Sequence, residues 1–269
     1  PNGTSSLYKE FPDRCFDVGI AEANMVGVAA GLAAYGYKPI VVTFAPFATR
    51  RVCDQIAVSV AYAKQNVKIV GTDPGITAEL NGGTHMSFED IATLRSIPNM
   101  TIYDAVDDTQ VYQAIKQIMN TDGPCYIRMP RKAAQPVYDE NYKFALNKAD
   151  VITKGNDITI VASGIMVAES LKAVLKLKEE GISAELISAN TIKPLDEETI
   201  LNSIKKTNHV VTCENHNVIG GLYSAVSEML IEKYPLHVDK IAVMDQFGQV
   251  GKYSELLNYY HLTSNDIYN

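Results

Sequence analysis

The first side chain whose type and position suggest chemistry is a glutamate near the start of the chain. Glu22 follows Gly19-Ile20-Ala21 and begins a run of small apolar residues with a helical pattern. An acid in the first turn of a helix is ordinary, because the helix dipole favours it there. The small residues, however, let another element approach and remove the carboxyl group from water, which helps it keep a proton near neutral pH. Glu22 is therefore a candidate for exchanging a proton with a bound ligand.

Two aromatic rings and a histidine form the next candidates. Phe44 and Phe47 stand at the end of an expected strand, directly before a helix. Ligands bind beyond the carboxyl ends of parallel strands, so a flat ring could stack here, although core packing explains these residues equally well. His85 follows two glycines in the loop after the next strand, and its affinity for protons suits proton transfer.

Arginines lie at the end of another expected strand. Arg128 is its last residue, and Arg131 follows three positions later. A guanidinium group at a strand end suits a phosphate or another anion, because its parallel N–H groups match two oxygens. Solvated surface charge is the default explanation for either residue alone. With Arg50, they can make a local basic pocket on an acidic chain.

The elements that would position these residues alternate along the chain, with short apolar strands between helices. This order predicts an α/β fold with mostly parallel sheets flanked by helices. The expected strands are Ile40–Phe44, Lys68–Gly71, Thr101–Tyr103, Tyr126–Arg128, Ile158–Ala162, Ala184–Ser188, His209–Cys213 and His237–Val243. The expected helices are Glu22–Ala34, Arg50–Lys64, Phe88–Ser96, Asp108–Met119, Met166–Glu180, Asp196–Lys206 and Gly221–Lys233. A stretch without periodicity divides the chain into domains 1–133 and 150–269, with a linker at 134–149.

Composition narrows the function classes. The chain has 269 residues, 46% of them hydrophobic, and a formal charge of −7, which makes a nucleic-acid partner unexpected. No apolar run reaches the roughly 20 residues that a membrane span needs. The four cysteines never form a Cys-x-x-Cys pair, so we expect free thiols in the cytoplasm and no metal site.

In their order along the chain, these segments resemble the transketolase family of thiamine diphosphate enzymes. The resemblance covers nearly the whole chain and corresponds to the pyrimidine-binding and C-terminal domains. Gly-Ile-Ala-Glu22-Ala-Asn-Met resembles the family's Gly-Ile-x-Glu-x-x-Met, and Thr-Phe44-Ala-Pro-Phe47 resembles Thr-Phe-x-x-Phe. Gly-Thr-His85 resembles Gly-Pro-Thr-His, and Arg131 lies where the family has its substrate-phosphate arginine.

The resemblance implies transfer of a two-carbon ketol unit from a ketose to an aldehyde. Glu22 would be the catalytic glutamate that protonates N1′ of the cofactor's pyrimidine, and Phe44 and Phe47 would hold the ring, with Arg50 as a further cofactor contact. His85 would bind the donor's hydroxyl or carbonyl and assist proton transfer. Arg131 would bind the anionic end of the sugar.

Several positions depart from the family pattern. Asp73-Pro74 stands where a standard transketolase has His-Asp, Asn81 replaces an acid, and Arg50 replaces an aromatic residue. Asp73, Asn81 and Arg128 are therefore included among the expected substrate contacts. These changes argue against the usual pentose and hexose phosphates as substrates. A sulfonated or branched-chain sugar is therefore an alternative substrate.

The family's diphosphate-binding half, with its Gly-Asp-Gly and downstream Asn, has no counterpart in this sequence. The resemblance therefore implies one subunit of a split transketolase. A partner polypeptide would hold Mg²⁺ and the diphosphate. This chain would also associate with itself through its pyrimidine-binding and C-terminal domains, which gives an α₂β₂ heterotetramer.

Two other functions fit part of the pattern. The beta subunit of a 2-oxoacid dehydrogenase's decarboxylating component has the same two domains, but Gly-Thr-His85 favours a transketolase. A non-catalytic scaffold subunit would keep the fold without the chemistry, and the presence of Glu22, both phenylalanines and His85 argues against it. Deoxyxylulose-phosphate synthase is normally a single longer chain.

Overall fold

The computed structural model describes residues 4–269, so residues 1–3 of the expected first domain lie outside the described part. The strands are β1 (Ile40–Phe44), β2 (Lys68–Thr72), β3 (Thr101–Asp104), β4 (Cys125–Met129), β5 (Asp150–Thr153), β6 (Ile158–Ala162), β7 (Ala184–Ser188), β8 (Thr191–Lys193), β9 (Val210–Asn217) and β10 (Asp239–Val243). The longer helices are α2 (Glu22–Ala34), α6 (Asp108–Asn120), α7 (Met166–Glu179), α8 (Glu197–Thr207) and α9 (Leu222–Lys233). The shorter helices and turns are α1 (Ser5–Glu10), η1 (Pro12–Arg14), α3 (Ala45–Ala48), η2 (Arg50–Val52), α4 (Cys53–Gln55), η3 (Ile56–Tyr62), η4 (Gly75–Asn81), α5 (Asp90–Arg95), α10 (Tyr253–Tyr259) and α11 (Ser264–Tyr268).

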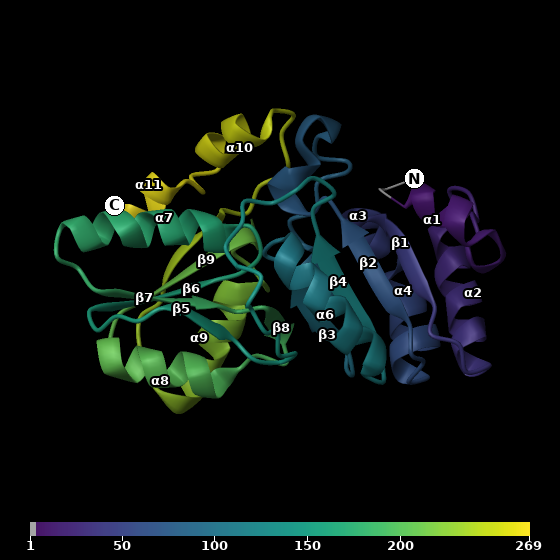
Figure 1. Ribbon diagram of the computed structural model, residues 1–269, viewed down its shortest axis with the longest axis horizontal. Coiled ribbons are helices and arrows are strands. Elements are labelled where there is room, and N and C mark those ends of the chain that lie inside the picture. The colour runs from purple at the N-terminus through teal and green to yellow at the C-terminus, as the bar shows by residue number, and fades with distance from the viewer. Residues whose placement is uncertain (1–3) are drawn as a thin grey trace.

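The strands form two sheets with helices on their faces, which confirms the expected α/β class (Figure 1). The order is β1-β2-β4-β3-β8 in the first sheet and β10-β9-β6-β7-β5 in the second. In each sheet four neighbouring strands are parallel, and one edge strand, β8 or β5, is antiparallel. Helix α7 lies on one side of the second sheet, and α8 and α9 lie on the other.

The first sheet is completed by a strand from the second half of the chain. Ile102 and Tyr103 of β3 pair with Lys193 and Thr191 of β8, which lies between the two sheets in Figure 1. Strand β8 is not predictable from the local sequence, because three residues before a proline give no detectable alternation. This strand ties the two halves together through backbone hydrogen bonds.

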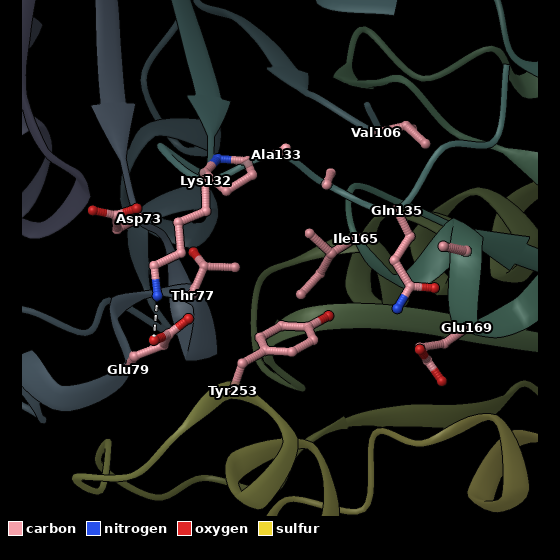
Figure 2. A pocket seen from close by; sticks show the side chains of 13 residues that line it. Asp73, Thr77, Glu79, Val106, Lys132, Ala133, Gln135, Ile165, Glu169 and Tyr253 are labelled. Atoms are coloured by element: carbon pink, nitrogen blue, oxygen red, sulfur yellow. Dashed lines mark hydrogen bonds and ion pairs between the residues drawn. The ribbon is translucent and has the colours of Figure 1, made fainter. Parts of the chain in front are cut away.

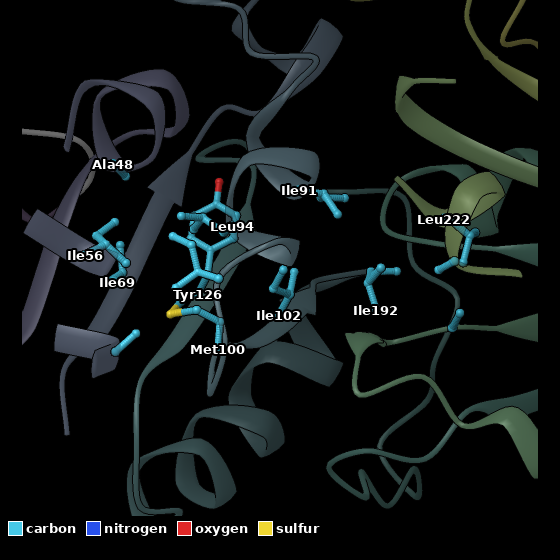
Figure 3. Packing of buried hydrophobic residues seen from close by; sticks show 14 of the residues in the cluster. Ala48, Ile56, Ile69, Ile91, Leu94, Met100, Ile102, Tyr126, Ile192 and Leu222 are labelled. Carbon is cyan, nitrogen blue, oxygen red and sulfur yellow. The ribbon is translucent and has the colours of Figure 1, made fainter. Parts of the chain in front are cut away.

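The hydrophobic core also crosses between the two halves. Ile69, Ile102 and Tyr126 of the first sheet belong to the same buried cluster as Ile192 of β8 and Leu222 of α9 (Figure 3). All five side chains are buried. Because a close-packed interior resists rearrangement, the shared core fixes how the two sheets are oriented.

The expected helix Arg50–Lys64 is wrong as a single element. A 3₁₀ turn (η2), one short α-helical segment (α4) and a π-helix (η3) occupy this range instead. Branched side chains such as Val52, Ile56 and Val60 are completely buried here, and packing them against the core overrides regular helix geometry. The irregular start determines where Arg50 and Arg51 point.

The linker has no helix or strand but is held against α6. Gln113 accepts from the backbone N–H of Phe144 at 2.9 Å, and Gln117 accepts from that of Leu146 at 2.9 Å. The Phe144 ring is buried against the first sheet. Across residues 4–269, no helix is long and apolar enough to cross a membrane.

Candidate functional site

The site lies at one edge of the first sheet, where its parallel strands end. Phe44 is the last residue of β1, Asp73 directly follows β2, and Arg131 lies two residues beyond β4. Because these strands are parallel neighbours, their carboxyl ends meet at the same edge. The topology therefore brings together three residues that are far apart in the sequence.

An aromatic cluster of Phe44, Phe47 and His85 occupies this edge. The two phenylalanine ring centroids lie 6.1 Å apart, and His85 lies 5.3 Å from Phe44 and 5.1 Å from Phe47. All three contacts are edge-to-face. The rings are only partly buried, so they present an apolar surface to a ligand.

One arginine, Arg51, connects Glu22 to this aromatic cluster. As the first residue of α2 it is buried, with 8% of its surface exposed. Arg51 donates from Nη1 to Oε1 of Glu22 at 2.9 Å, and its guanidinium carbon lies 3.7 Å from the Phe47 ring centroid. Within residues 4–269, Oε2 of Glu22 has no hydrogen-bond partner, so this oxygen is available to a ligand.

Arg51 is not among the residues predicted from the sequence, whereas its neighbour Arg50 is. Arg50 donates from Nη1 to Oε1 of Glu89 at 2.7 Å and from Nη2 to the carbonyl of Thr84 at 3.4 Å. Arg50 therefore braces the loop that carries His85, whereas Arg51 contacts the ring and the carboxylate. Two adjacent arginines give no spacing signal that distinguishes them, because the 3₁₀ turn decides their directions.

The His85 loop is shaped by glycines and by contact with the second half of the chain. Gly82 has a φ of +68°, which disfavours a side chain. A Cβ on Gly83 would lie 2.6 Å from the carbonyl oxygen of Gly248, so only glycine permits this approach. Thr84 Oγ1 lies 2.9 Å from Nδ1 of His85 and helps to orient the imidazole ring.

Asp73 and Arg131 form an ion pair beside the aromatic cluster. Asp73 is buried, and its Oδ1 accepts from the backbone N–H of Arg131 at 3.0 Å. Its Oδ2 accepts from Nε of Arg131. The Arg131 guanidinium carbon lies 4.9 Å from the Phe44 ring centroid. Asn81, also expected as a substrate contact, is exposed and donates from Nδ2 to the carbonyl of Ala78 at 2.8 Å.

The expectation that Arg128 binds substrate needs correction, because its side chain is buried, with the whole residue 1% exposed. It donates from Nε to Asp90 at 2.8 Å, from Nη1 to Asp104 at 3.2 Å and from Nη2 to the carbonyl of Asn215 at 2.6 Å. Asp90 and Asp104 hold its pKa above the usual value against the opposing effect of burial. Arg128 is an internal link between the two halves.

A cavity of about 250 Å³ lies nearby, between the first sheet, α7 and α10 (Figure 2). Asp73, Thr77 and Glu79 line one side, and Ile165, Glu169 and Tyr253 line the other. Of the site residues described above, only Asp73 lines this cavity. The cavity is therefore distinct from the surface formed by Glu22 and the aromatic cluster.

Comparison with known families decides what this arrangement is. Residues 1–136 match the model of the transketolase pyrimidine-binding domain, and residues 147–267 match that of the transketolase C-terminal domain. The chain belongs to the transketolase family. A pyrimidine-binding domain of this family implies thiamine diphosphate as the cofactor.

Two relatives are subunits of transketolases with named sugar substrates. The chain is 52% identical to the 6-deoxy-6-sulfo-D-fructose transketolase subunit SqwH of Clostridium sp. (strain MSTE9), over 96% of this chain and 80% of that protein. It is 36% identical to one subunit of the apulose-4-phosphate transketolase of Phocaeicola vulgatus (strain ATCC 8482 / DSM 1447 / JCM 5826 / CCUG 4940 / NBRC 14291 / NCTC 11154), over 96% of this chain and 83% of that protein.

A solved structure described as a split gene transketolase, inactive beta4 tetramer, superimposes with a TM-score of 0.90 at 41% identity. The match covers 98% of this chain and 85% of that chain. The chain is accordingly one subunit of a split, two-subunit transketolase, which is a transferase. The alternatives of a 2-oxoacid decarboxylating subunit and a scaffold are set aside.

Proposed function

We propose that the edge formed by Glu22, Phe44, Phe47 and His85 binds the pyrimidine ring of thiamine diphosphate and the reacting end of a ketose. The observation that carries this proposal is the buried Glu22, joined through Arg51 to the aromatic cluster. When bound, thiamine diphosphate supplies a carbon nucleophile that takes up and passes on a two-carbon ketol unit. The side chains of this transketolase subunit then hold or transfer protons and orient the bound ligands.

The side chains present fit the pyrimidine. Oε2 of Glu22 has no partner within residues 4–269 and can hold a proton at the ring nitrogen N1′. Phe44 and Phe47 offer the apolar surface that a flat ring needs. His85 would hydrogen-bond the donor's hydroxyl or carbonyl and move a proton there.

The anionic end of the ketose would bind Arg131, with Asn81 contributing its exposed amide. Both named relatives act on sugars with a sulfonate or a phosphate, according to their names. The Arg131 guanidinium lies on the face of Phe44, next to the cluster that contains His85. We therefore propose an anionic ketose as donor and an aldehyde as acceptor.

The second subunit would complete the site. In residues 4–269, no group of three or more acidic, histidine or cysteine side chains is arranged to hold a metal ion. We propose that the partner holds Mg²⁺ and the diphosphate, and that two copies of each subunit form an α₂β₂ assembly. A related beta4 tetramer described as inactive is consistent with this need for a partner. The four free cysteines suit a reducing cytoplasm.

The experiment is reconstitution of this chain with its diphosphate-binding partner, thiamine diphosphate and Mg²⁺. We expect ketol transfer from an anionic ketose to an aldehyde by the pair, and none by either chain alone. Decarboxylation of 2-oxoacids in place of ketol transfer would contradict the proposal. Binding of thiamine diphosphate by calorimetry provides a readout that does not depend on the sugar.

A further inference from the structure

We infer that Asp73 is a positioning residue that makes the anion-binding site selective for a terminal group with a single negative charge. A sulfonate would then be favoured over a phosphate ester on the same sugar. The inference rests on the proposed function, because it assumes that Arg131 binds the anionic end of the ketose.

The geometry of the pair determines which donors remain for a ligand. Asp73 accepts from the backbone N–H and from Nε of Arg131. Among residues 4–269, no acceptor binds Nη1 or Nη2 of Arg131. These two terminal nitrogens lie side by side on a planar group and match two oxygens of a tetrahedral anion. Asp73 therefore orients the guanidinium without occupying the donors that an anion needs.

The position of the pair places such an anion beside the reacting groups. The Arg131 guanidinium carbon lies 4.9 Å from the Phe44 ring centroid, and Phe44 contacts His85 at 5.3 Å. Asp73 itself is 2% exposed, and its two carboxylate oxygens are held by the backbone N–H and Nε of Arg131. The guanidinium is thus fixed by a carboxylate along one edge and by a ring along one face.

The charges around this site cancel in pairs. Asp73 neutralises Arg131, and in the described part of the chain three further cationic side chains around the cluster and its loop are each paired with a carboxylate. These pairs are Lys132 with Glu79, Arg50 with Glu89, and Arg51 with Glu22. A site without net positive charge offers less compensation for the hydration that a bound anion loses, and this shortfall grows with the charge of the anion.

The two candidate terminal groups differ in that charge. A sulfonate carries one negative charge throughout the physiological pH range. A phosphate ester loses its second proton near about pH 6 and carries two charges above it. The second charge would face the carboxylate of Asp73 across the guanidinium group. The site therefore discriminates between two groups of the same shape by charge.

The test compares 6-deoxy-6-sulfofructose with fructose 6-phosphate as donors for the reconstituted enzyme, with one acceptor. Asp73→Asn keeps the size of the side chain and removes its charge. We expect the ratio of kcat/KM for phosphate over sulfonate to rise about tenfold, through KM more than kcat. Asp122→Asn makes the same change at an exposed position where Asp122 contacts Asn66, and should leave the ratio unchanged.

A pH profile of the unmodified enzyme gives a second readout that a merely structural role would not move. The phosphate-over-sulfonate ratio should fall as the pH rises through about 6, because the phosphate gains its second charge there. Asp73→Asn should flatten or reverse that fall. If this variant does not fold, the profile of the unmodified enzyme still tests the selectivity for a singly charged group, and a profile without the fall overturns the inference.

The outcomes separate the inference from the proposed function. A ratio that is independent of pH, or unchanged in a folded Asp73→Asn enzyme that transfers ketol units, overturns the role of Asp73 only. Transfer from neither donor contradicts the proposed function and this inference with it.

Discussion

At Glu22 one carboxylate oxygen faces Arg51 and the other is open to a ligand. Glu22→Gln keeps the size and polarity of the side chain but removes its ability to exchange a proton. We expect kcat of the reconstituted transketolase to fall at least about 100-fold, which is the scale of a lost general acid or base. Steady-state ketol-transfer kinetics measure this effect. The exposed substitution Glu140→Gln should change nothing, and near-normal turnover of Glu22→Gln would refute the assignment.

Arg51 lies on the Phe47 ring and donates to Glu22. Arg51→Met keeps an apolar chain over the ring but removes the hydrogen bond that orients the carboxylate. We expect the reconstituted enzyme to bind thiamine diphosphate about tenfold more weakly, the scale of one charge-assisted hydrogen bond. Calorimetric titration measures this affinity for thiamine diphosphate. Arg14→Met removes another arginine that lies over a ring, Phe11, and provides the matched control. Equal affinities in both variants would exclude the role of Arg51.

At the scale of elements, β4 carries an arginine into the interior. Arg128 contacts Asp90 of α5, Asp104 of β3 and the backbone of Asn215 in β9. Arg128→Met leaves two buried carboxylates without their cation, so the free energy of unfolding should fall by about 3–5 kcal/mol. Urea denaturation of the full chain measures this change. A loss below about 1 kcal/mol would mean that the cluster is dispensable, and Arg14→Met again serves as the surface control.

The start of α9 is capped by a carboxylate from β9. Glu214 accepts from the backbone N–H groups of Leu222 at 2.6 Å and Tyr223 at 2.9 Å. Burial raises the pKa of Glu214 to about 7, against an unfolded value of about 4.3. Between these two pKa values, Glu214 is protonated in the folded chain and ionised in the unfolded chain. This contribution to stability is complete below about pH 4.3 and is lost as the pH rises through about 7.

Glu214→Gln removes that titration. The free energy of unfolding of this variant, relative to the unmodified chain, should increase between about pH 5 and pH 8 by up to about 3 kcal/mol. Burial lowers the pKa of the neighbouring His216 to about 4, which makes stability fall on the acid side. His216 is present in both proteins, so its effect largely cancels in the difference. A difference that does not change with pH would contradict the assigned titration of Glu214.

At the scale of the whole molecule, helix α2 leaves one face uncovered. A Cβ added at Gly27 or Gly31 would meet nothing within 4 Å, and Ile20 and Tyr35 at either end of this face are 94% and 89% exposed. The small residues of α2 predict a close approach by another element, and no element among residues 4–269 makes that approach at the two glycines. We expect this face to contact another subunit in the proposed assembly.

Gly27→Leu tests that contact. Leucine is a better helix former than glycine by up to about 1 kcal/mol, so the isolated chain should be as stable or slightly more stable. The added side chain should nevertheless block assembly and, with it, ketol transfer. Sedimentation of the reconstituted protein measures the assembly state, with Asn202→Leu on the exposed side of α8 as control. Normal assembly of Gly27→Leu would place the interface elsewhere.

Much of this transketolase subunit was predictable from local sequence. All eight expected strands occur, because short apolar runs between turn residues identify buried strands of a parallel sheet. Strand β8 was not predictable, because it is stabilised by pairing with β3, a partner far away in the sequence. The same holds for the irregular segments of Arg50–Tyr62, where core packing overrides helix propensity.

The sequence by itself determined the family and the types of residues available for chemistry, since both depend on motifs of a few adjacent residues. Only the tertiary structure decided which of those residues reach the site. Arg128 lies inside the protein and Arg131 at the site, although three positions separate them. Arg51 rather than Arg50 contacts Glu22, and Asp73 holds Arg131. The physical reason is that such contacts join segments distant in the chain, whose directions are set by strand ends, turns and packing.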